Sequence, residues 1–252
     1  ALEIMKESNR KRFAHKGDSV IDVNNRIIEN AIYNMHEIDV NKEWINLTYE
    51  ERKSLNFEET IGLLKGDSLP VSAFLDKKSG IVEGGNTKYE KRDIAENVPC
   101  WIKENCIQCN QCAFVCPHAV IRPYLLDGDN DYDNTLDSMF PKDKKYAIGI
   151  SYEDCTGCGL CANICPGKNG EKALTMEKYD KSKFTNKEFE YLNENKIDYE
   201  AKLKNVKNVG FIEPKFEYSG ACAGCGETPY IKNLTQLFNN NLMIANATGC
   251  SS

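Results

Sequence analysis

The cysteines are the residues of this sequence whose number and spacing most clearly indicate chemistry. Twelve occur among 252 residues, none of them before residue 100, and they fall into three tight groups. Disulfide frameworks spread cysteines so that the bridges close long loops, whereas the ligands of one metal centre come from a few neighbouring loop positions. The share of cysteine, about five per cent, is also below the roughly 8 to 10% typical of small disulfide scaffolds. The clustering therefore favours metal binding.

Two of the groups repeat one motif, C-x2-C-x2-C-x3-C-P. Its cysteines are Cys106, Cys109, Cys112 and Cys116 in the first copy and Cys155, Cys158, Cys161 and Cys165 in the second. This run is a known ligand pattern for 4Fe–4S clusters, in which three thiolates hold one cluster and the fourth ligates the other cluster. The predicted ligand sets are cluster A (Cys106, Cys109, Cys112 and Cys165) and cluster B (Cys155, Cys158, Cys161 and Cys116).

Zinc and disulfides are the alternative interpretations of these two motifs. Zinc ribbons usually have two CxxC pairs a dozen or more residues apart, whereas each motif here has three cysteines within seven residues. The segments CIQCNQCAFVCPHAV and CTGCGLCANICPGKN also form an internal duplication. A duplication of this kind predicts a pseudo-twofold α+β ferredoxin fold of short strands and helices. We expect the clusters to supply much of its cohesion, because so small a module has little apolar core.

Three features near the motifs have simpler interpretations. The aspartates between the copies suggest a calcium loop, but Tyr132 and Ser138 stand where such a loop needs Gly and Glu, so we expect a solvated acidic insertion. His118 follows the first CP pair, and we expect a loop residue and not a ligand. Cys100 lies outside the ligand spacing beside Trp101, and we expect a buried free thiol.

The segments before the motifs predict short helices and a connector. Apolar residues recur at steps of three and four over residues 19–35, which predicts a helix that packs on a core elsewhere. Residues 57–65 predict a second helix that ends at Gly66. We expect an extended segment over 69–75, a turn over 76–80 and a polar connector over 81–97.

The segments after the motifs predict a linker and the start of another domain. Residues 181–208 are highly charged and predict a helical or loosely ordered linker. Residues 211–226 predict a loop, 228–239 a helix, and 242–247 an apolar strand that runs into Gly249-Cys250. A strand that feeds a Gly-rich turn is how open α/β sheets present ligands.

Composition and charge exclude several partners. The net charge is −6 and no basic stripe is present, which disfavours nucleic acid. The sequence contains no run of 18 apolar residues, so it predicts no membrane span. Residues 1–12 lack the apolar region of a signal peptide. We therefore expect a cytoplasmic protein. Because the sequence begins without Met, we interpret it as the interior of a longer polypeptide.

The third cysteine group carries a resemblance to a known family. Alone, the CxxC of Cys222 and Cys225 is equally compatible with zinc or a redox dithiol. Its surroundings, YSGACAGCGETPY and later ANATGCSS around Cys250, resemble the thiamine-diphosphate domain of pyruvate:ferredoxin (flavodoxin) oxidoreductases. Upstream, TKYEKRDIAENVPCW over residues 87–101 resembles the EKR segment of that family. The order of segments matches from about residue 10 to the end.

The resemblance implies a domain order and further sites. Residues 1–40 would end a preceding coenzyme A-binding domain, 41–99 would be the EKR connector, 100–180 the ferredoxin-like domain, 181–208 a linker and 209–252 the start of the thiamine-diphosphate domain. Cys222, Cys225 and Cys250 would ligate a third 4Fe–4S cluster whose fourth ligand lies outside this chain. Glu227 and Cys250 would contact thiamine diphosphate. The Mg²⁺ ligands and most of the coenzyme A pocket would lie elsewhere, and the basic run 10–16 fits a coenzyme A phosphate or a solvated turn equally well.

The resemblance also implies an activity and partners. Such an enzyme converts pyruvate and coenzyme A to acetyl-CoA and CO2, and passes electrons through its clusters to ferredoxin or flavodoxin. We expect the remaining domains of the same enzyme as partners, and a homodimer at full length. The alternatives are another 2-oxoacid oxidoreductase, a stand-alone ferredoxin-type electron carrier, or a zinc-stabilised interaction module.

Overall fold

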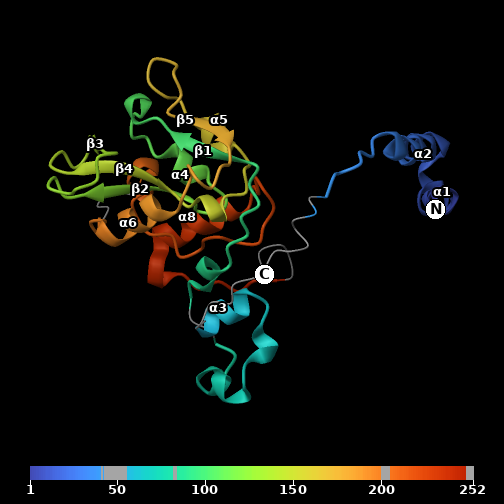
Figure 1. Cartoon of the computed structure of the whole chain (residues 1–252), viewed down its shortest axis with the longest axis horizontal. Coiled ribbons are helices and arrows are strands. Elements are labelled where there is room, and N and C mark those ends of the chain that lie inside the picture. Colours follow the sequence, from blue (N-terminus) through green and yellow to red (C-terminus); the bar gives the residue numbers. More distant parts are fainter. Residues whose placement is uncertain (41, 43–55, 82–83, 200–204, 248–252) are drawn as a thin grey trace. The chain divides into compact units, whose positions relative to one another are not determined.

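The computed structural model describes residues 1–40, 42, 56–81, 84–199 and 205–247 of the chain (Figure 1). The chain divides into two compact units, residues 1–53 and 54–252, and each is described by itself. Across these described ranges, no helix combines the length and the apolar character that a membrane crossing requires.

The first unit is a pair of helices. Helix α1 (Leu2–Phe13) continues through a 3-10 turn (Ala14–Lys16), and Gly17, at φ +91°, separates it from α2 (Asp18–Tyr33). The buried Asn9 side chain joins the two helices, because its Nδ2 donates to the carbonyl of Ile21 at 3.1 Å. The helix predicted over 19–35 is confirmed. Within residues 1–40 its apolar positions Val23 and Ile27 stay 47% and 63% exposed, so the core that they would pack on is not formed there.

The second unit begins with one α-helix and three short 3-10 helices. Helix α3 (Phe57–Gly62) confirms the existence and start of the predicted second helix, and Asn56 and Glu59 cap that start reciprocally. The helix ends at Gly62 and not before Gly66, because Leu64 has a positive φ of 57°. The 3-10 helices are Gly66–Ser68, Val71–Lys77 and Asn86–Tyr89.

The prediction of an extended segment over residues 69–75 is wrong for most of its length. Leu69 and Pro70 are extended, but the 3-10 helix begins at Val71, where the Ala73 amide donates to the Pro70 carbonyl at 2.9 Å. This helix lets Phe74 pack edge-on against Phe57, with ring centroids 5.2 Å apart. The apolar Phe74 therefore packs from a tight helix and not from a strand.

The cysteine motifs lie in a small α+β fold with two antiparallel sheets. Strand β1 (Asn97–Trp101) pairs with β5 (Leu174–Lys178), and β2 (Ile121–Leu126), β4 (Lys145–Ile150) and β3 (Leu136–Asp137) form a second sheet in the order β2-β4-β3. Each cysteine motif carries one short helix, α4 (Gln111–Val115) in the first and α5 (Leu160–Ile164) in the second. A 3-10 turn precedes each motif, at Lys103–Asn105 and Tyr152–Asp154. The two halves thus repeat the same local structure, as the duplication predicted.

The acidic insertion between the halves is solvated, as expected. Asp127 and Asp137 are 65% and 89% exposed and pair with Lys144 and Lys145, at 2.8 and 2.6 Å. The insertion ends in β3, which extends the second sheet.

Part of the predicted linker belongs to the core. Helix α6 (Lys187–Asn195) contacts both β2 and β4 (Figure 1), and its Phe189 and Leu192 are buried among their side chains. Charged residues surround these two positions in the sequence, so the average charge of the segment concealed an amphipathic helix. The helical alternative is therefore confirmed for residues 187–195, and this helix packs on the sheet.

The C-terminal segment consists of two helices joined by a long loop. Helix α7 (Val206–Val209) precedes the loop, and α8 (Thr228–Phe238) continues into a 3-10 turn (Asn239–Asn241). The predicted loop and helix are confirmed. The predicted strand over 242–247 is wrong: these residues pair with no strand in the described ranges, and Met243 is 95% exposed. Apolar residues alone do not form a strand without a neighbouring edge.

Candidate iron–sulfur centres

Two small cavities lie among the cysteines, and each is lined by one predicted ligand set. Cavity A contains the cysteines Cys106, Cys109, Cys112 and Cys165. Cavity B contains Cys116, Cys155, Cys158 and Cys161. The two have the same volume, about 20 Å³ each. The fourth cysteine of each motif therefore lies in the cavity of the other motif, which is the arrangement that the spacing predicted.

The donor sets fit a group larger than a single ion. Zinc holds four ligands at about 2.0 to 2.3 Å, which draws their sulfur and nitrogen atoms close together. Among the described residues, no three Cys, His, Asp or Glu side chains lie close enough to hold one metal ion. Four thiols around one shared cavity instead match the corners of a 4Fe–4S cluster.

The backbone of each motif curls around its cavity through two residues with positive φ. In the second motif they are Gly157 and Gly159, at φ +68° and +74°, which glycine adopts without steric cost. In the first motif the same positions are Gln108 and Asn110, at φ +53° and +59°. The curl directs amides at ligand sulfurs: Gly157 N–H donates to Cys155 Sγ at 3.4 Å.

The side chains of these two non-glycine residues form hydrogen bonds with segments that neighbour the first motif. Gln108 donates to the Asp137 carbonyl and accepts from the Met139 amide, both at 2.8 Å. Asn110, 1% exposed, accepts from the Tyr146 hydroxyl at 2.7 Å and donates to the Lys207 carbonyl at 2.6 Å. The cysteine spacing gave no sign of these two residues, although asparagine at a Gly position of the repeat is a usable signal for positive φ.

Burial makes the free thiols poor acids. It raises the pKa of Cys155 to about 12, and it also raises the pKa of Cys106, Cys112 and Cys161. Metals bind the thiolate, so iron has to displace a proton from each thiol. The centres are therefore apolar sites in which metal binding and pH are coupled.

The loop that carries the third cysteine group passes beside Cys158 of cavity B. Cys222 is exposed and Cys225 half-buried, and a β-carbon placed on Gly224 between them would lie 3.6 Å from Cβ of Cys158. The backbone N–H groups of Thr228 and Glu227 at the start of α8 lower the pKa of Cys225, which favours its thiolate. Cys250 lies outside the described residues.

His118 occupies a loop, as predicted, and holds the third group in place. It is 2% exposed, and its Nδ1 and Nε2 lie 3.1 and 3.3 Å from the carbonyl oxygens of Ser219 and Cys222. Burial lowers its pKa. Both ring nitrogens face backbone oxygens, so the side chain orients the loop and is not positioned as a metal ligand.

Cys100 differs from the expectation of a buried thiol. It lies on β1 and is half-buried, because the antiparallel partner β5 leaves its side chain near Glu177. Burial and then the hydrogen bond with Glu177 raise the pKa of its thiol.

Lys232 is a buried cation that sequence reasoning missed. It projects from α8, is 2% exposed, and donates to the carbonyls of Ala113, Phe114 (2.9 Å) and Cys116 (3.3 Å) at the end of α4. Burial lowers its pKa to about 8, against the opposing influence of Cys116 and Cys112. A positive charge therefore lies between the ligands of the two cavities.

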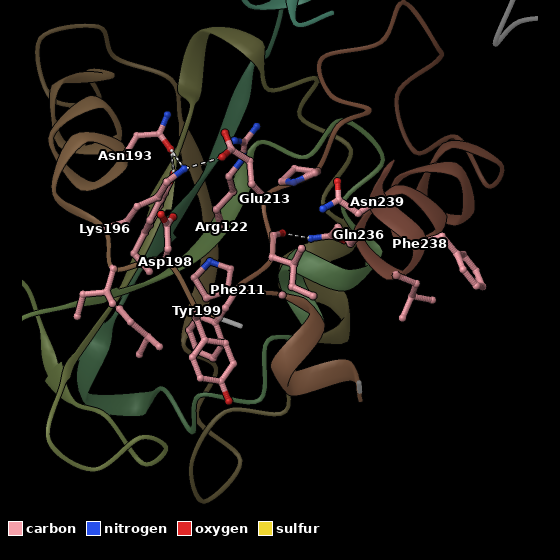
Figure 2. Close-up of a pocket in the computed structure, with 18 of the residues that line it drawn as sticks. Arg122, Asn193, Lys196, Asp198, Tyr199, Phe211, Glu213, Gln236, Phe238 and Asn239 are labelled. Atoms are coloured by element: carbon pink, nitrogen blue, oxygen red, sulfur yellow. Dashed lines mark hydrogen bonds and ion pairs between the residues drawn. The ribbon is translucent and has the colours of Figure 1, made fainter. Parts of the chain in front are cut away.

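A wider cavity of about 730 Å³ lies away from the cysteines (Figure 2). Its walls come from β2, the segment after α6, and α8. Gln236 closes one wall by donating to the Ile212 carbonyl at 2.6 Å, and Lys196 pairs with Glu213 at 2.9 Å. No cysteine lines this cavity, so it is separate from the two candidate cluster sites.

Comparison with known families agrees with this geometry. Residues 105–168 match the family described as "4Fe-4S double cluster binding domain", and residues 56–95 match "EKR", a domain of unknown function. The chain therefore contains a double 4Fe–4S cluster-binding domain.

Known relatives then place the chain in a particular enzyme family. The chain is 43% identical over its whole length to the "Pyruvate:ferredoxin oxidoreductase" of Moorella thermoacetica and 39% to the "Pyruvate-flavodoxin oxidoreductase" of Enterobacter agglomerans. It is 37% identical to the "Pyruvate dehydrogenase [NADP(+)]" of Cryptosporidium parvum. The chain spans 23%, 22% and 15% of the lengths of these relatives. It is homologous to one segment of the pyruvate:ferredoxin and pyruvate-flavodoxin oxidoreductases.

Proposed function

We propose that this chain is the electron-transfer segment of a pyruvate:ferredoxin or pyruvate-flavodoxin oxidoreductase. One observation supports more than a simple two-cluster carrier: Gly224, between Cys222 and Cys225, lies beside Cys158 of cavity B. Electrons that enter at the third group would pass to cluster B and then to cluster A. Relatives named as oxidoreductases that act on pyruvate support the same reading.

The residues that would hold the clusters are the two sets of cysteines that line the cavities. Bound 4Fe–4S clusters supply one-electron carriers whose potentials depend on hydrogen bonds and burial. The protein's contribution is to hold the thiols around each cavity, to aim amides such as that of Gly157 at the ligand sulfurs, and to exclude water with apolar neighbours.

The third cluster and the thiamine site form the second part of the proposal. Cys222, Cys225 and Cys250 would ligate the third cluster, and a fourth cysteine would come from elsewhere in the polypeptide. The lowered pKa of Cys225 suits a thiolate ligand. Glu227 and Cys250 would contact thiamine diphosphate, by resemblance to the family. Mg²⁺ and coenzyme A would bind in the other domains, and the exposed basic residues 10–16 are candidates for a coenzyme A phosphate.

The proposed partners follow from the same relatives. Ferredoxin or flavodoxin would accept the electrons, and the full-length enzyme would be a homodimer. We propose a cytoplasmic location, where thiols stay reduced. Residues 1–40, 41–99, 100–180, 181–208 and 209–252 remain the proposed domain divisions, except that α6 within 181–208 packs on β2 and β4 and is assigned to the ferredoxin-like domain.

A variant of the full-length polypeptide tests the proposal. Cys222→Ala should abolish pyruvate-dependent reduction of ferredoxin and flavodoxin, because it removes a ligand at the entry to the electron path. It should leave about eight irons in clusters A and B, with absorption near roughly 400 nm. Cys100→Ala, a cysteine outside all three ligand sets, is the matched control and should stay active. Full activity of Cys222→Ala would contradict the place given to the third group in the electron path. A wild-type polypeptide that holds the clusters but shows no pyruvate-dependent reduction would favour a ferredoxin-type carrier, and a colourless zinc-containing protein would exclude both.

A further inference from the structure

Residues 87–93, which include the triplet Glu90-Lys91-Arg92, lie between two cysteine-bearing loops. One loop is 151–155, which runs into Cys155 of cavity B, and the other is 217–222, which runs into Cys222. These residues belong to the segment that matches a domain of unknown function, so their contacts are the direct indication of what they do.

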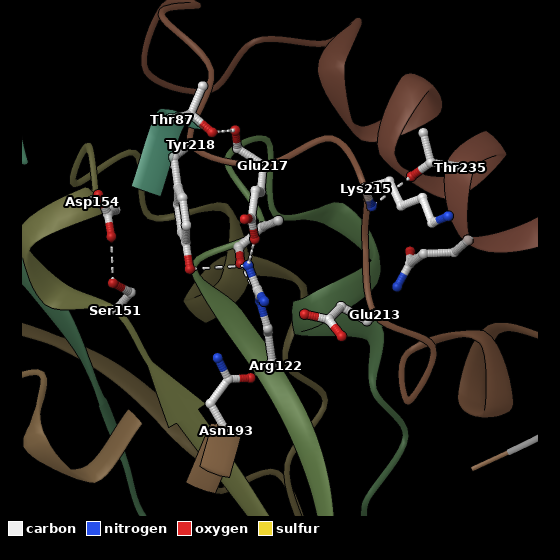
Figure 3. A network of polar contacts seen from close by, with 12 residues as sticks. Thr87, Arg122, Ser151, Asp154, Asn193, Glu213, Lys215, Glu217, Tyr218 and Thr235 are labelled. Carbon is white, nitrogen blue, oxygen red and sulfur yellow. Dashed lines mark hydrogen bonds and ion pairs between the residues drawn. The ribbon is translucent and has the colours of Figure 1, made fainter. Parts of the chain in front are cut away.

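The contact with the first loop is an ion pair between the partly exposed Lys91 and a buried carboxylate. Lys91 Nζ lies 2.5 Å from Oδ2 of Asp154, the residue immediately before Cys155, and the Asp154 side chain is 1% exposed. Ser151 Oγ donates to the same carboxylate oxygen at 2.5 Å (Figure 3). The Asp93 amide donates to the Glu153 carbonyl at 2.9 Å. A buried carboxylate needs a partner of this kind, because removing the cation leaves an uncompensated charge.

The contact with the second loop uses both neighbours of Lys91 in the chain and Lys91 itself. Arg92 donates to the Ser219 carbonyl at 3.1 Å, and Glu90 orients the guanidinium at 3.1 Å. Thr87 Oγ1 donates to the Glu217 carbonyl at 2.9 Å (Figure 3). The Lys91 ammonium lies 5.1 Å from the ring centre of Tyr218.

One lysine therefore contacts both loops. Its ammonium pairs with Asp154 on one side and lies over Tyr218 on the other, while Arg92 holds Ser219. The far side of the second loop is fixed to the double-cluster fold, because Arg122 pairs with Glu217 and donates to the Tyr218 hydroxyl at 3.0 Å (Figure 3). The loop is thus held from both sides.

We propose that residues 87–93 are a clamp that fixes the Cys222–Cys225 loop against the Cys155–Cys158 loop, with Lys91 and Arg92 as its positioning residues. The role of the clamp in electron transfer rests on the proposed function: if a third cluster forms at Cys222 and Cys225, the clamp sets the distance between that cluster and cluster B. The clamp itself depends on contacts within this chain.

Hydrogen exchange of the 252-residue chain, with clusters A and B reconstituted without oxygen, tests the clamp. The reporter is the amide of Tyr218, which donates to the His118 carbonyl at 3.0 Å. In the double variant Lys91→Met/Arg92→Met this amide should exchange at least about tenfold faster, because the free energy required for local opening of the loop is lower. Amides of β2 and β4 should keep their wild-type rates, and the electron-spin signals of both clusters should persist.

Two further variants separate positioning from general stability. The charge-conserving swap Lys91→Arg/Arg92→Lys should restore Tyr218 exchange to within about threefold of wild type. Lys78→Met, an exposed lysine of the same connector, should have no effect. A Tyr218 rate in the double variant within about twofold of wild type, or an equal rise in β2 and β4, would overturn the clamp. Neither measurement needs the third cluster, so failure of the clamp is distinct from failure of the Cys222→Ala test.

Discussion

Replacement of the buried lysine of α8, Lys232→Met, probes how the C-terminal segment is joined to the clusters. Methionine keeps the length and apolar character of the side chain but removes the ammonium that three carbonyls at the end of α4 share. Two quantities should change: the free energy that docks α8 on α4, and the reduction potentials of the clusters whose ligands Cys112 and Cys116 lie near the charge.

The size of the docking effect follows from two opposing contributions. Leaving two or three buried carbonyls unpaired costs about 1 to 3 kcal/mol each. Removing the ammonium also relieves its burial, which lowers the pKa from 10.5 to about 8 and corresponds to about 3 kcal/mol. The net loss is about 2 kcal/mol, or roughly a thirtyfold change in the opening equilibrium of α8.

The potentials should fall, because a nearby cation stabilises the extra electron of a reduced cluster. Unit charges about 8 Å apart interact by about 2 kcal/mol at an effective dielectric constant of about 20. For a one-electron couple this corresponds to a decrease of roughly 90 mV.

The assay combines amide exchange in α8 with a redox titration followed by electron-spin resonance. Lys215→Met is the control, since Lys215 is exposed and bonds Asn240 away from the clusters. Lys232→Met should show both effects and the control neither. Unchanged potentials together with unchanged α8 exchange would refute the reasoning that this charge links α8 to the cluster domain.

Two more predictions concern the cluster loops. Gly157→Ala should speed cluster loss on heating more than Gly159→Ala does. Both glycines have positive φ, so both variants carry backbone strain of about 1 to 2 kcal/mol, but only at Gly157 would the new β-carbon meet a backbone oxygen, that of Asn97 at 3.0 Å. Equal rates of cluster loss in the two variants would contradict this geometry. Acid should also release the clusters: burial raises the pKa of Cys155 to about 12, so protons compete with iron increasingly as pH falls. The 400 nm absorption should therefore decay faster at roughly pH 6 than at roughly pH 8, and pH-independent decay would be inconsistent with thiols held in an apolar cavity.

The cysteine spacing and the structure agree on which thiols share a cavity, whereas several of the elements around them differ from expectation. Regular cysteine spacing reports which loop positions face one centre, and the cavities lined by Cys116 with the second motif and Cys165 with the first agree with it. The helix over 228–239 forms as predicted, with a Pro near its start. Its buried residues are polar, however, and its apolar Leu234 and Phe238 stay exposed, which the sequence did not indicate.

The features that sequence reasoning missed depend on distant partners. In the sequence Lys232 is one lysine of a predicted helix, and its burial arises only because α8 packs on the end of α4. The α6 residues Phe189 and Leu192 are two apolar positions in a charged segment, and their burial depends on the sheet beneath them. The segment 242–247 has the composition of a strand, but composition does not supply an edge with which to pair.

Comparison of single-cysteine variants tests the cross-ligated clusters most directly. Four variants of the 252-residue chain, Cys106→Ala, Cys116→Ala, Cys155→Ala and Cys165→Ala, would be reconstituted without oxygen, reduced and compared by electron-spin resonance. The account predicts that Cys116→Ala loses the same signal as Cys155→Ala, and that Cys165→Ala loses the same signal as Cys106→Ala, because these pairs line the same cavities. If Cys116→Ala instead matched Cys106→Ala, each motif would hold its own cluster and the central claim would be wrong.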